Sequence, residues 1–147
     1  MGFFEAIQTC FTKYVVFEGR ARRAEYWWFF LFNLIVSAVG RLSPLLSAIV
    51  SLALILPNLA VNMRRLHDVD RSGWYLLLPL PAGVIALVFY LIAYTAPAPA
   101  FAATVMILGG LATLACYLVL LVWYCQRGTV GANRFGPDPL TLARVAP

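Results

Sequence analysis

Residues 100–124 read AFAATVMILGGLATLACYLVLLVWY, a stretch without a single charged side chain. Three further stretches, residues 24–40, 45–63 and 74–94, are also strongly apolar. A helix needs about 20 such residues to cross a hydrocarbon core about 30 Å thick, within a usable range of about 17 to 25. Helices are favoured over barrel strands, because strands would alternate polar and apolar residues. We therefore predict an all-α membrane protein, a four-helix transmembrane bundle.

Composition excludes a soluble globular domain, because 63% of the residues are hydrophobic and only 12% are charged. That leaves too little polar surface to cover a soluble core. The net charge of +5 could indicate nucleic-acid binding. In a membrane protein, however, basic side chains near the helix ends orient the chain and meet anionic headgroups. We expect membrane lipids and not nucleic acid as partners.

The basic residues are distributed in alternate gaps between the apolar stretches. All of the 11 Lys and Arg residues except Arg41 lie in residues 1–23, in the loop before Trp74 or in residues 125–147. In a four-helix topology these three segments share one side of the membrane. The positive-inside rule makes that side cytoplasmic. We predict a multi-pass protein with both termini in the cytoplasm, and residues 125–147 as a cytoplasmic tail.

The amino-terminal segment has the pattern of an amphipathic helix. Phe3, Ile7, Cys10, Phe11 and Tyr14 recur at helical spacing, which is typical of an interfacial helix lying on the membrane. A segment that merely covers the ends of the other helices would show the same pattern. Residues 1–23 thus comprise this helix and a basic linker.

The basic linker followed by an apolar run is similar to a signal peptide. We expect no cleavage, because three more hydrophobic stretches follow the first one and the charged region before it is long. Cys10 and Cys125 are predicted on the cytoplasmic side and Cys116 inside the fourth stretch. We therefore expect neither a structural disulfide nor a metal site.

The second stretch carries amides in its cytoplasmic half. Asn58 and Asn62 lie four residues apart and share a helix face, and Asn33 in the first stretch is a potential partner. Pro57 frees the carbonyl of Ala53. These amides are costly in hydrocarbon unless they are paired. They indicate either structural hydrogen bonds between helices or a polar path.

Residues 64–74, RRLHDVDRSGW, are the densest polar cluster, and they permit three interpretations. Asp68 and Asp70 could neutralise Arg64, Arg65 and Arg71 in an internal salt-bridge network. The arginines could instead bind an anion or a headgroup. His67 beside Asp68 could support acid–base chemistry, but no nucleophile accompanies it. We predict no catalytic, cofactor-binding or metal-binding residue.

Three motifs resemble a bacterial inner-membrane family catalogued as domain of unknown function 805. They are FEGRARRAEYWWF at residues 17–29, RRLHD with RSGW within residues 64–74, and GANRFGPDP at residues 131–139. Asp70 departs from the family's usual small residue before the RSGW run. The resemblance implies a small integral inner-membrane protein of bacteria and supplies no activity.

All three motifs map to the predicted cytoplasmic side. The glycines and prolines of the tail predict a disordered segment by default, whereas the turn former, cation and aromatic ring within residues 133–137 would also allow it to fold back onto the loop. Twelve polar and aromatic residues of these motifs are the candidates for binding a ligand or partner. These candidates are Arg20, Arg22, Arg23, Glu25, Arg64, Arg65, His67, Asp68, Arg71, Trp74, Asn133 and Arg134.

The leading functional hypothesis is a non-enzymatic module whose cytoplasmic face binds an anionic lipid headgroup or a partner protein. One alternative is a small transporter or channel subunit with a path lined by Asn33, Asn58 and Asn62, in a homo-oligomer or with a partner membrane protein. A second alternative is an enzyme acting on a lipid phosphate, with His67 as base and the arginines as a clamp.

Overall fold

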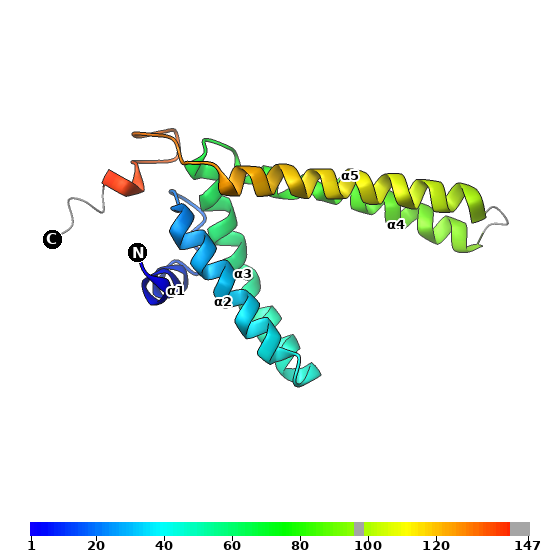
Figure 1. The fold of residues 1–147 in the computed structure, drawn as a ribbon, viewed down its shortest axis with the longest axis horizontal. Helices are drawn as coiled ribbons and strands as arrows, with labels where there is room; N and C mark the ends of the chain where they lie inside the picture. Colours follow the sequence, from blue (N-terminus) through cyan, green and yellow to red (C-terminus); the bar gives the residue numbers. More distant parts are fainter. Residues whose placement is uncertain (96–98, 142–147) are drawn as a thin grey trace. The chain divides into compact units, whose positions relative to one another are not determined.

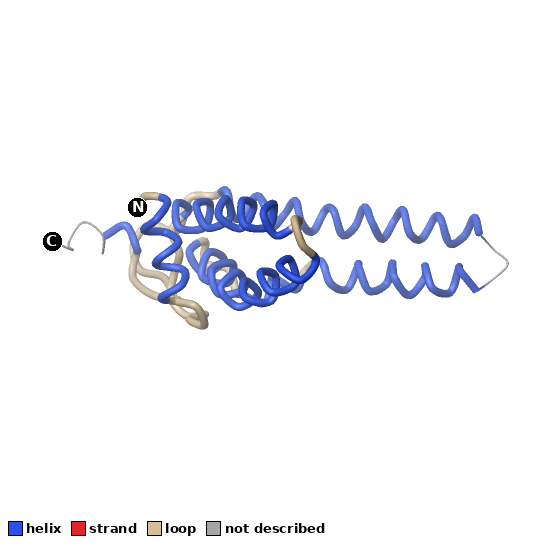
Figure 2. The backbone as a smooth tube through the Cα atoms, turned by 90° about the horizontal axis from the view of Figure 1, so that it is seen from below, coloured by secondary structure: helices blue, strands red, loops and turns tan. Residues whose placement is uncertain are grey.

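The computed structural model describes residues 1–95 and 99–141, and this part of the chain is helical (Figures 1 and 2). Residues 96–98, which lie in the gap between the third and fourth apolar stretches, and residues 142–147, which include Arg144, lie outside the described residues. The prediction of an all-helical protein is confirmed. The helices are α1 (Phe3–Thr12), α2 (Arg23–Gly40), α3 (Pro44–Asp68), the 3₁₀ helix η1 (Gly73–Leu77), α4 (Pro79–Thr95) and α5 (Pro99–Cys125).

The chain forms two compact units. The first contains Met1–Gly73 and Tyr124–Pro147, and the second contains Trp74–Trp123. The first unit therefore holds α1, α2, α3, the last residues of α5 and the tail. The second unit is the hairpin of α4 and α5, which run side by side in both views (Figures 1 and 2).

Among the described residues, three helical segments are long and apolar enough to cross a membrane. They are Pro44–Asp68, Gly73–Ile92 and Ala103–Cys125, with mean hydropathies of 2.1, 2.2 and 2.5. Helix α2 is not among them, since it begins with Arg23 and carries a buried Glu25 in its first turn. Its crossing of the membrane stays a prediction.

Helix α1 packs on α2 through aromatic rings and small side chains. Ala6 and Cys10 are fully buried. The Phe3 ring lies 5.8 Å from Trp28, and the Phe11 ring lies 6.0 Å from Phe29. The helix ends at Thr12, before Tyr14, which is the last residue of the predicted apolar pattern, because the β-branched residues that follow are weak helix formers.

Pro57 lies inside α3 and is buried. Proline has no backbone N–H, so the carbonyl of Ala53 loses its helical donor. The hydroxyl of Tyr14 donates a hydrogen bond to this carbonyl. The segment after α1 is thereby attached to α3 at the point where the helix is weakest.

The amides of α2 and α3 bond to each other and to backbone carbonyls. The Asn58 amide donates to the side-chain oxygen of Asn33 at 2.9 Å, which confirms the predicted partner. Asn33 donates to the carbonyl of Phe29, and Asn62 donates to that of Asn58. These are the hydrogen bonds that a structural role for the asparagines requires.

Helix α3 continues to Asp68, beyond the predicted end at Met63. The first part of the predicted loop is therefore the last turn of a helix, and its charged side chains are buried. The helix stops where Asp70 adopts a left-handed conformation with φ of 57°. An aspartate tolerates this conformation better than most residues. The ends of the apolar stretches thus mark where the charges begin and not where the helix ends.

A glycine brings α4 and α5 close together within the second unit. A Cβ atom on Gly109 would lie 2.6 Å from the Cβ of Ala86, whereas a Cβ on the adjacent Gly110 would meet open space. Small residues at such positions let helix backbones approach closely.

Gly109→Ala is expected to lower the stability of the hairpin by about 1–3 kcal/mol, the usual cost of overpacking. Gly110→Ala is the matched control, because it makes the same change in helix propensity without the clash. The measurement is the unfolding midpoint in mixed micelles. Equal midpoints for the two variants would contradict close packing at Gly109.

Candidate functional site

Polar and charged side chains are buried in the first unit at the end of α3. Arg64, Arg65, His67 and Asp68 are exposed by 1%, 0%, 8% and 4%. Buried charges are tolerated only when they are paired and hydrogen-bonded. Each of these arginines has an acidic partner, so the end of α3 is a polar core.

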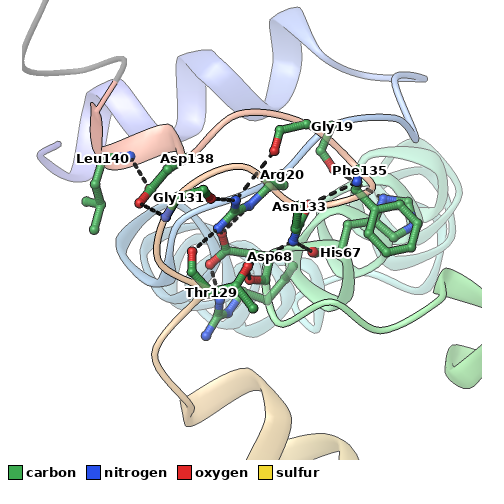
Figure 3. Close-up of polar contacts among 12 residues, drawn as sticks. Gly19, Arg20, His67, Asp68, Thr129, Gly131, Asn133, Phe135, Asp138 and Leu140 are labelled. Atoms are coloured by element: carbon green, nitrogen blue, oxygen red, sulfur yellow. Dashed lines mark hydrogen bonds and ion pairs between the residues drawn. The ribbon is translucent and has the colours of Figure 1, made fainter.

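Arg20 joins this polar core to the tail (Figure 3). Its Nε lies 3.0 Å from Oδ1 of Asp68. Its two terminal nitrogens donate to the carbonyl oxygens of Gly131 and Thr129, both at 2.6 Å. The planar guanidinium can satisfy several acceptors at once, so one side chain holds the segment after α5 against the end of α3.

Asp68 and Arg65 connect α3 to the end of α5. Nη1 of Arg65 lies 2.5 Å from Oδ2 of Asp68. The same guanidinium donates to the carbonyl oxygens of Tyr124, at 3.1 and 3.2 Å, and of Gln126. The last carbonyls of a helix have no intrahelical partner, and here Arg65 supplies their donors. Gly128 allows the backbone to lie close to the Asp68 side chain, because a Cβ atom at this position would lie 2.6 Å from Cγ of Asp68.

Arg64 faces α1 and α2. Its Nη1 lies 2.6 Å from Oε1 of Glu25, which is 3% exposed. The thiol of Cys10 lies 4.0 Å from the same oxygen. Burial, together with the nearby Glu25 carboxylate, raises the pKa of the Cys10 thiol to about 12. This thiol therefore stays protonated and behaves as a small apolar group.

The tail folds back onto the end of α3, which is the alternative to the disordered tail that its glycines and prolines predict by default. Nδ2 of Asn133 donates to the carbonyl oxygen of His67 at 2.9 Å. The Phe135 ring stacks on the His67 ring at 3.9 Å and 3° between planes (Figure 3). Gly131 and Gly136, with φ of 80° and 138°, make the turns that this path needs.

The ion pairs differ from the predicted network within residues 64–74. Asp68 pairs with Arg65, as expected, and also with Arg20. Arg64 pairs instead with Glu25. Asp70 pairs with Arg134 in an exposed contact. The network therefore joins three distant segments, because the partners are brought together only by packing.

The remaining candidates lie outside this interior network. Arg22 is half-buried, Arg23 is exposed, and the backbone N–H of Arg71 donates to the carbonyl of Leu66. Trp74 belongs to the second unit and is 76% exposed. The three asparagines lie between α2 and α3, farther along the helices.

A cavity of about 620 Å³ lies beside the polar core, between the start of α2 and the segment after α5. We call it the arginine pocket. Its lining includes Arg22, Arg23, Arg127, Trp27, Trp28 and Asp138, with Arg20 and Asp68 at the polar core. Neither Arg127 nor Asp138 is among the candidates predicted from the sequence. The only signal for Arg127 was its place as the first cation after the last apolar stretch.

Asp138 is an ionised acceptor in the wall of the arginine pocket. Its carboxylate accepts the backbone N–H of Leu140 at 2.8 Å and of Gly131 at 3.2 Å (Figure 3). These two donors, with Arg20 and Arg127 nearby, lower the pKa of the Asp138 carboxyl below its ordinary value. At neutral pH it is an anion that can only accept hydrogen bonds.

The chemistry of this site is better suited to holding an anion than to transforming one. The ring of His67 is covered by Phe135, and its Nδ1 lies 3.1 Å from the carbonyl oxygen of Gly19. The Cys10 thiol is fully buried. Within residues 1–95 and 99–141, no three His, Cys, Asp or Glu side chains are grouped so as to hold a metal ion. The accessible groups are guanidinium donors beside indole rings.

Comparisons with known proteins agree with the motifs. The model of a family described as protein of unknown function (DUF805) matches residues 14–137. Inner membrane protein YhaI of Escherichia coli (strain K12) is 41% identical over 136 residues, which cover 86% of this chain and 88% of that protein. Inner membrane protein YhaH of the same strain is 37% identical over 139 residues, covering 86% and 89%. No solved structure matches significantly. The chain therefore belongs to the DUF805 family of inner membrane proteins.

Proposed function

We propose that the protein is a non-enzymatic inner-membrane module whose cytoplasmic face binds the phosphate of an anionic lipid headgroup. In this proposal four helices cross the membrane and both termini are cytoplasmic. The observation that carries the proposal is the arginine pocket, where Arg22, Arg23 and Arg127 surround a cavity beside two tryptophans.

Three arginines of the pocket differ from those of the polar core in their exposure to solvent. Arg20, Arg64 and Arg65 are no more than 7% exposed and pair with buried carboxylates. Arg23 and Arg127 are exposed and Arg22 is half-buried. Guanidinium groups suit phosphate oxygens because they can donate two parallel hydrogen bonds. The ligand therefore meets the pocket arginines, while the core arginines maintain the fold.

Aromatic side chains support a position of the pocket at headgroup depth. Trp27 and Trp28 line it from the first turns of α2, and tryptophan is enriched at membrane interfaces. Phe3 contacts Trp28 from α1, and Phe4 is 83% exposed. An interfacial α1 would bury Phe4 among the lipids and hold the pocket beside the phosphates.

The test is native mass spectrometry of the protein extracted with its own lipids. The triple variant Arg22→Gln/Arg23→Gln/Arg127→Gln is expected to retain anionic lipid roughly 100-fold more weakly, because each basic residue near the surface contributes about 1 kcal/mol. The difference should shrink at high salt, which screens exposed charges.

The matched control is Arg41→Gln, which removes the one cation predicted on the opposite side of the membrane. It should retain anionic lipid as the parent does. Equal retention by the triple variant and the parent, at every salt concentration, would exclude the arginine pocket as a lipid site.

A further inference from the structure

We infer that the ligand of the arginine pocket is an anionic phosphodiester headgroup that carries hydroxyl groups beyond its phosphate, as a glycerol headgroup does. This inference rests on the proposed function and narrows it to one chemical class. It follows from the volume of the pocket, from the carboxylates in its wall and from its balance of charge.

The volume of the pocket exceeds what a phosphate group needs. At about 620 Å³, it holds on the order of 20 water molecules at about 30 Å³ each. Pockets for small molecules span about 300–1,000 Å³. The pocket is partly open to solvent, and its volume leaves room for a further group attached to the phosphate.

The wall beyond the arginines offers hydrogen-bond acceptors. Asp68 and Asp138 both line the pocket. Asp68 is engaged by Arg20 and Arg65. Asp138 accepts two backbone N–H groups, while a carboxylate has about four acceptor positions. Asp138 therefore has capacity for a hydroxyl of the ligand, and its position between Gly131 and Leu140 is set by the folded tail.

The balance of charge selects an anionic ligand. Four arginines and two aspartates line the pocket, so positive charge is in excess. A phosphate without a hydroxyl-bearing substituent would bind the arginines but would offer no hydroxyl donor to the Asp138 carboxylate. A phosphodiester with hydroxyls matches both sides, because its phosphate meets the arginines and its O–H groups meet Asp138.

The experiment compares two lipids of equal charge on the intact, unmodified protein. Phosphatidylglycerol and phosphatidylmethanol both carry one phosphodiester charge, but only the first has hydroxyls beyond the phosphate. We expect native mass spectrometry to show about tenfold stronger retention of phosphatidylglycerol, as one hydrogen bond to a charged acceptor would give. Equal retention of the two lipids would overturn the inference.

The variant Asp138→Asn tests whether the Asp138 carboxylate is the acceptor that causes the preference for phosphatidylglycerol. Asp138→Asn should remove the preference, while Asp70→Asn, which alters an exposed carboxylate paired with Arg134, should keep it. A preference that survives Asp138→Asn unchanged would contradict the assignment. Soluble glycerophosphoglycerol provides the second arm. Lipid retained against a millimolar excess of it assigns the site to the intact lipid, whereas displacement by that excess assigns it to the headgroup phosphodiester alone.

The two proposals fail in different ways. Equal retention of both lipids by the parent, with loss of both in the triple arginine variant, overturns the hydroxyl preference and leaves the proposed lipid site in place. Retention of both lipids by the triple variant at the level of the parent overturns the lipid site itself.

Discussion

Arg20→Ala is expected to release the segment after α5 from the end of α3. The change removes the donors to the carbonyls of Thr129 and Gly131 and one of the two partners of the buried Asp68 carboxylate. Loss of one partner of a buried ion pair costs about 3–5 kcal/mol. Hydrogen exchange of the peptide covering residues 126–141 should become more than 100-fold faster, since exchange follows the population of the open state.

Arg134→Ala is the matched control for this prediction. Arg134 also joins the tail to the end of α3, through an ion pair with Asp70, but these side chains are 61% and 47% exposed. Exposed pairs contribute at most about 1 kcal/mol, so exchange should change several-fold at most. Similar exchange rates in the two variants would show that Arg20 does not hold the tail.

The second large effect is expected at the pair of Arg64 and Glu25. Both side chains are buried, and their nearest atoms are 2.6 Å apart. Arg64→Leu leaves the Glu25 carboxylate buried without its cation, and Glu25→Leu leaves the guanidinium without its anion. Each single variant should lose about 3–5 kcal/mol of stability, measured as the unfolding midpoint in mixed micelles by tryptophan fluorescence.

The double variant Glu25→Leu/Arg64→Leu distinguishes a buried ion pair from two independent contributions. Replacing both partners by apolar groups removes the cost of desolvating two charges and is often neutral or stabilising. In addition, Nε and Nη2 of Arg64 are buried without a hydrogen-bond partner among the residues that the structure describes, so the pair is not optimally satisfied. We expect the double variant to be more stable than either single variant. Additive losses would contradict coupling between the two residues.

Patterns within short stretches of the sequence predicted the structural features that are determined by a single segment and its surroundings. The uninterrupted apolar stretches predicted α3, α4 and α5, because the bilayer requires helices of a certain length and composition. Pro57 predicted a free carbonyl, and Asn33 was a natural partner for Asn58 because both amides had to be satisfied away from water. The three motifs predicted the family. Each of these inferences uses only the chemistry of a segment and its solvent.

The partners of the charged residues could not be predicted in the same way. Asp68 could have paired with any of the arginines within residues 64–74 or beyond, and only the fold brings Arg20 to it. Arg127 and Asp138 were not recognised as candidates, because the arginine pocket exists only when the tail lies against α2. Membership of a cavity depends on distances between segments, and sequence spacing does not contain them.

The amino-acid sequence by itself determined that this chain is a helical inner-membrane protein with its polar chemistry gathered in three motifs. The tertiary structure decided which arginines are buried and which are exposed. Arg64 and Arg65 are buried because their carboxylate partners lie inside the fold, and Arg23 and Arg127 stay exposed around the pocket. The same type of side chain is buried in an ion pair in one place and exposed in another, since burial and pairing set the free energy of a charge and both arise only from packing.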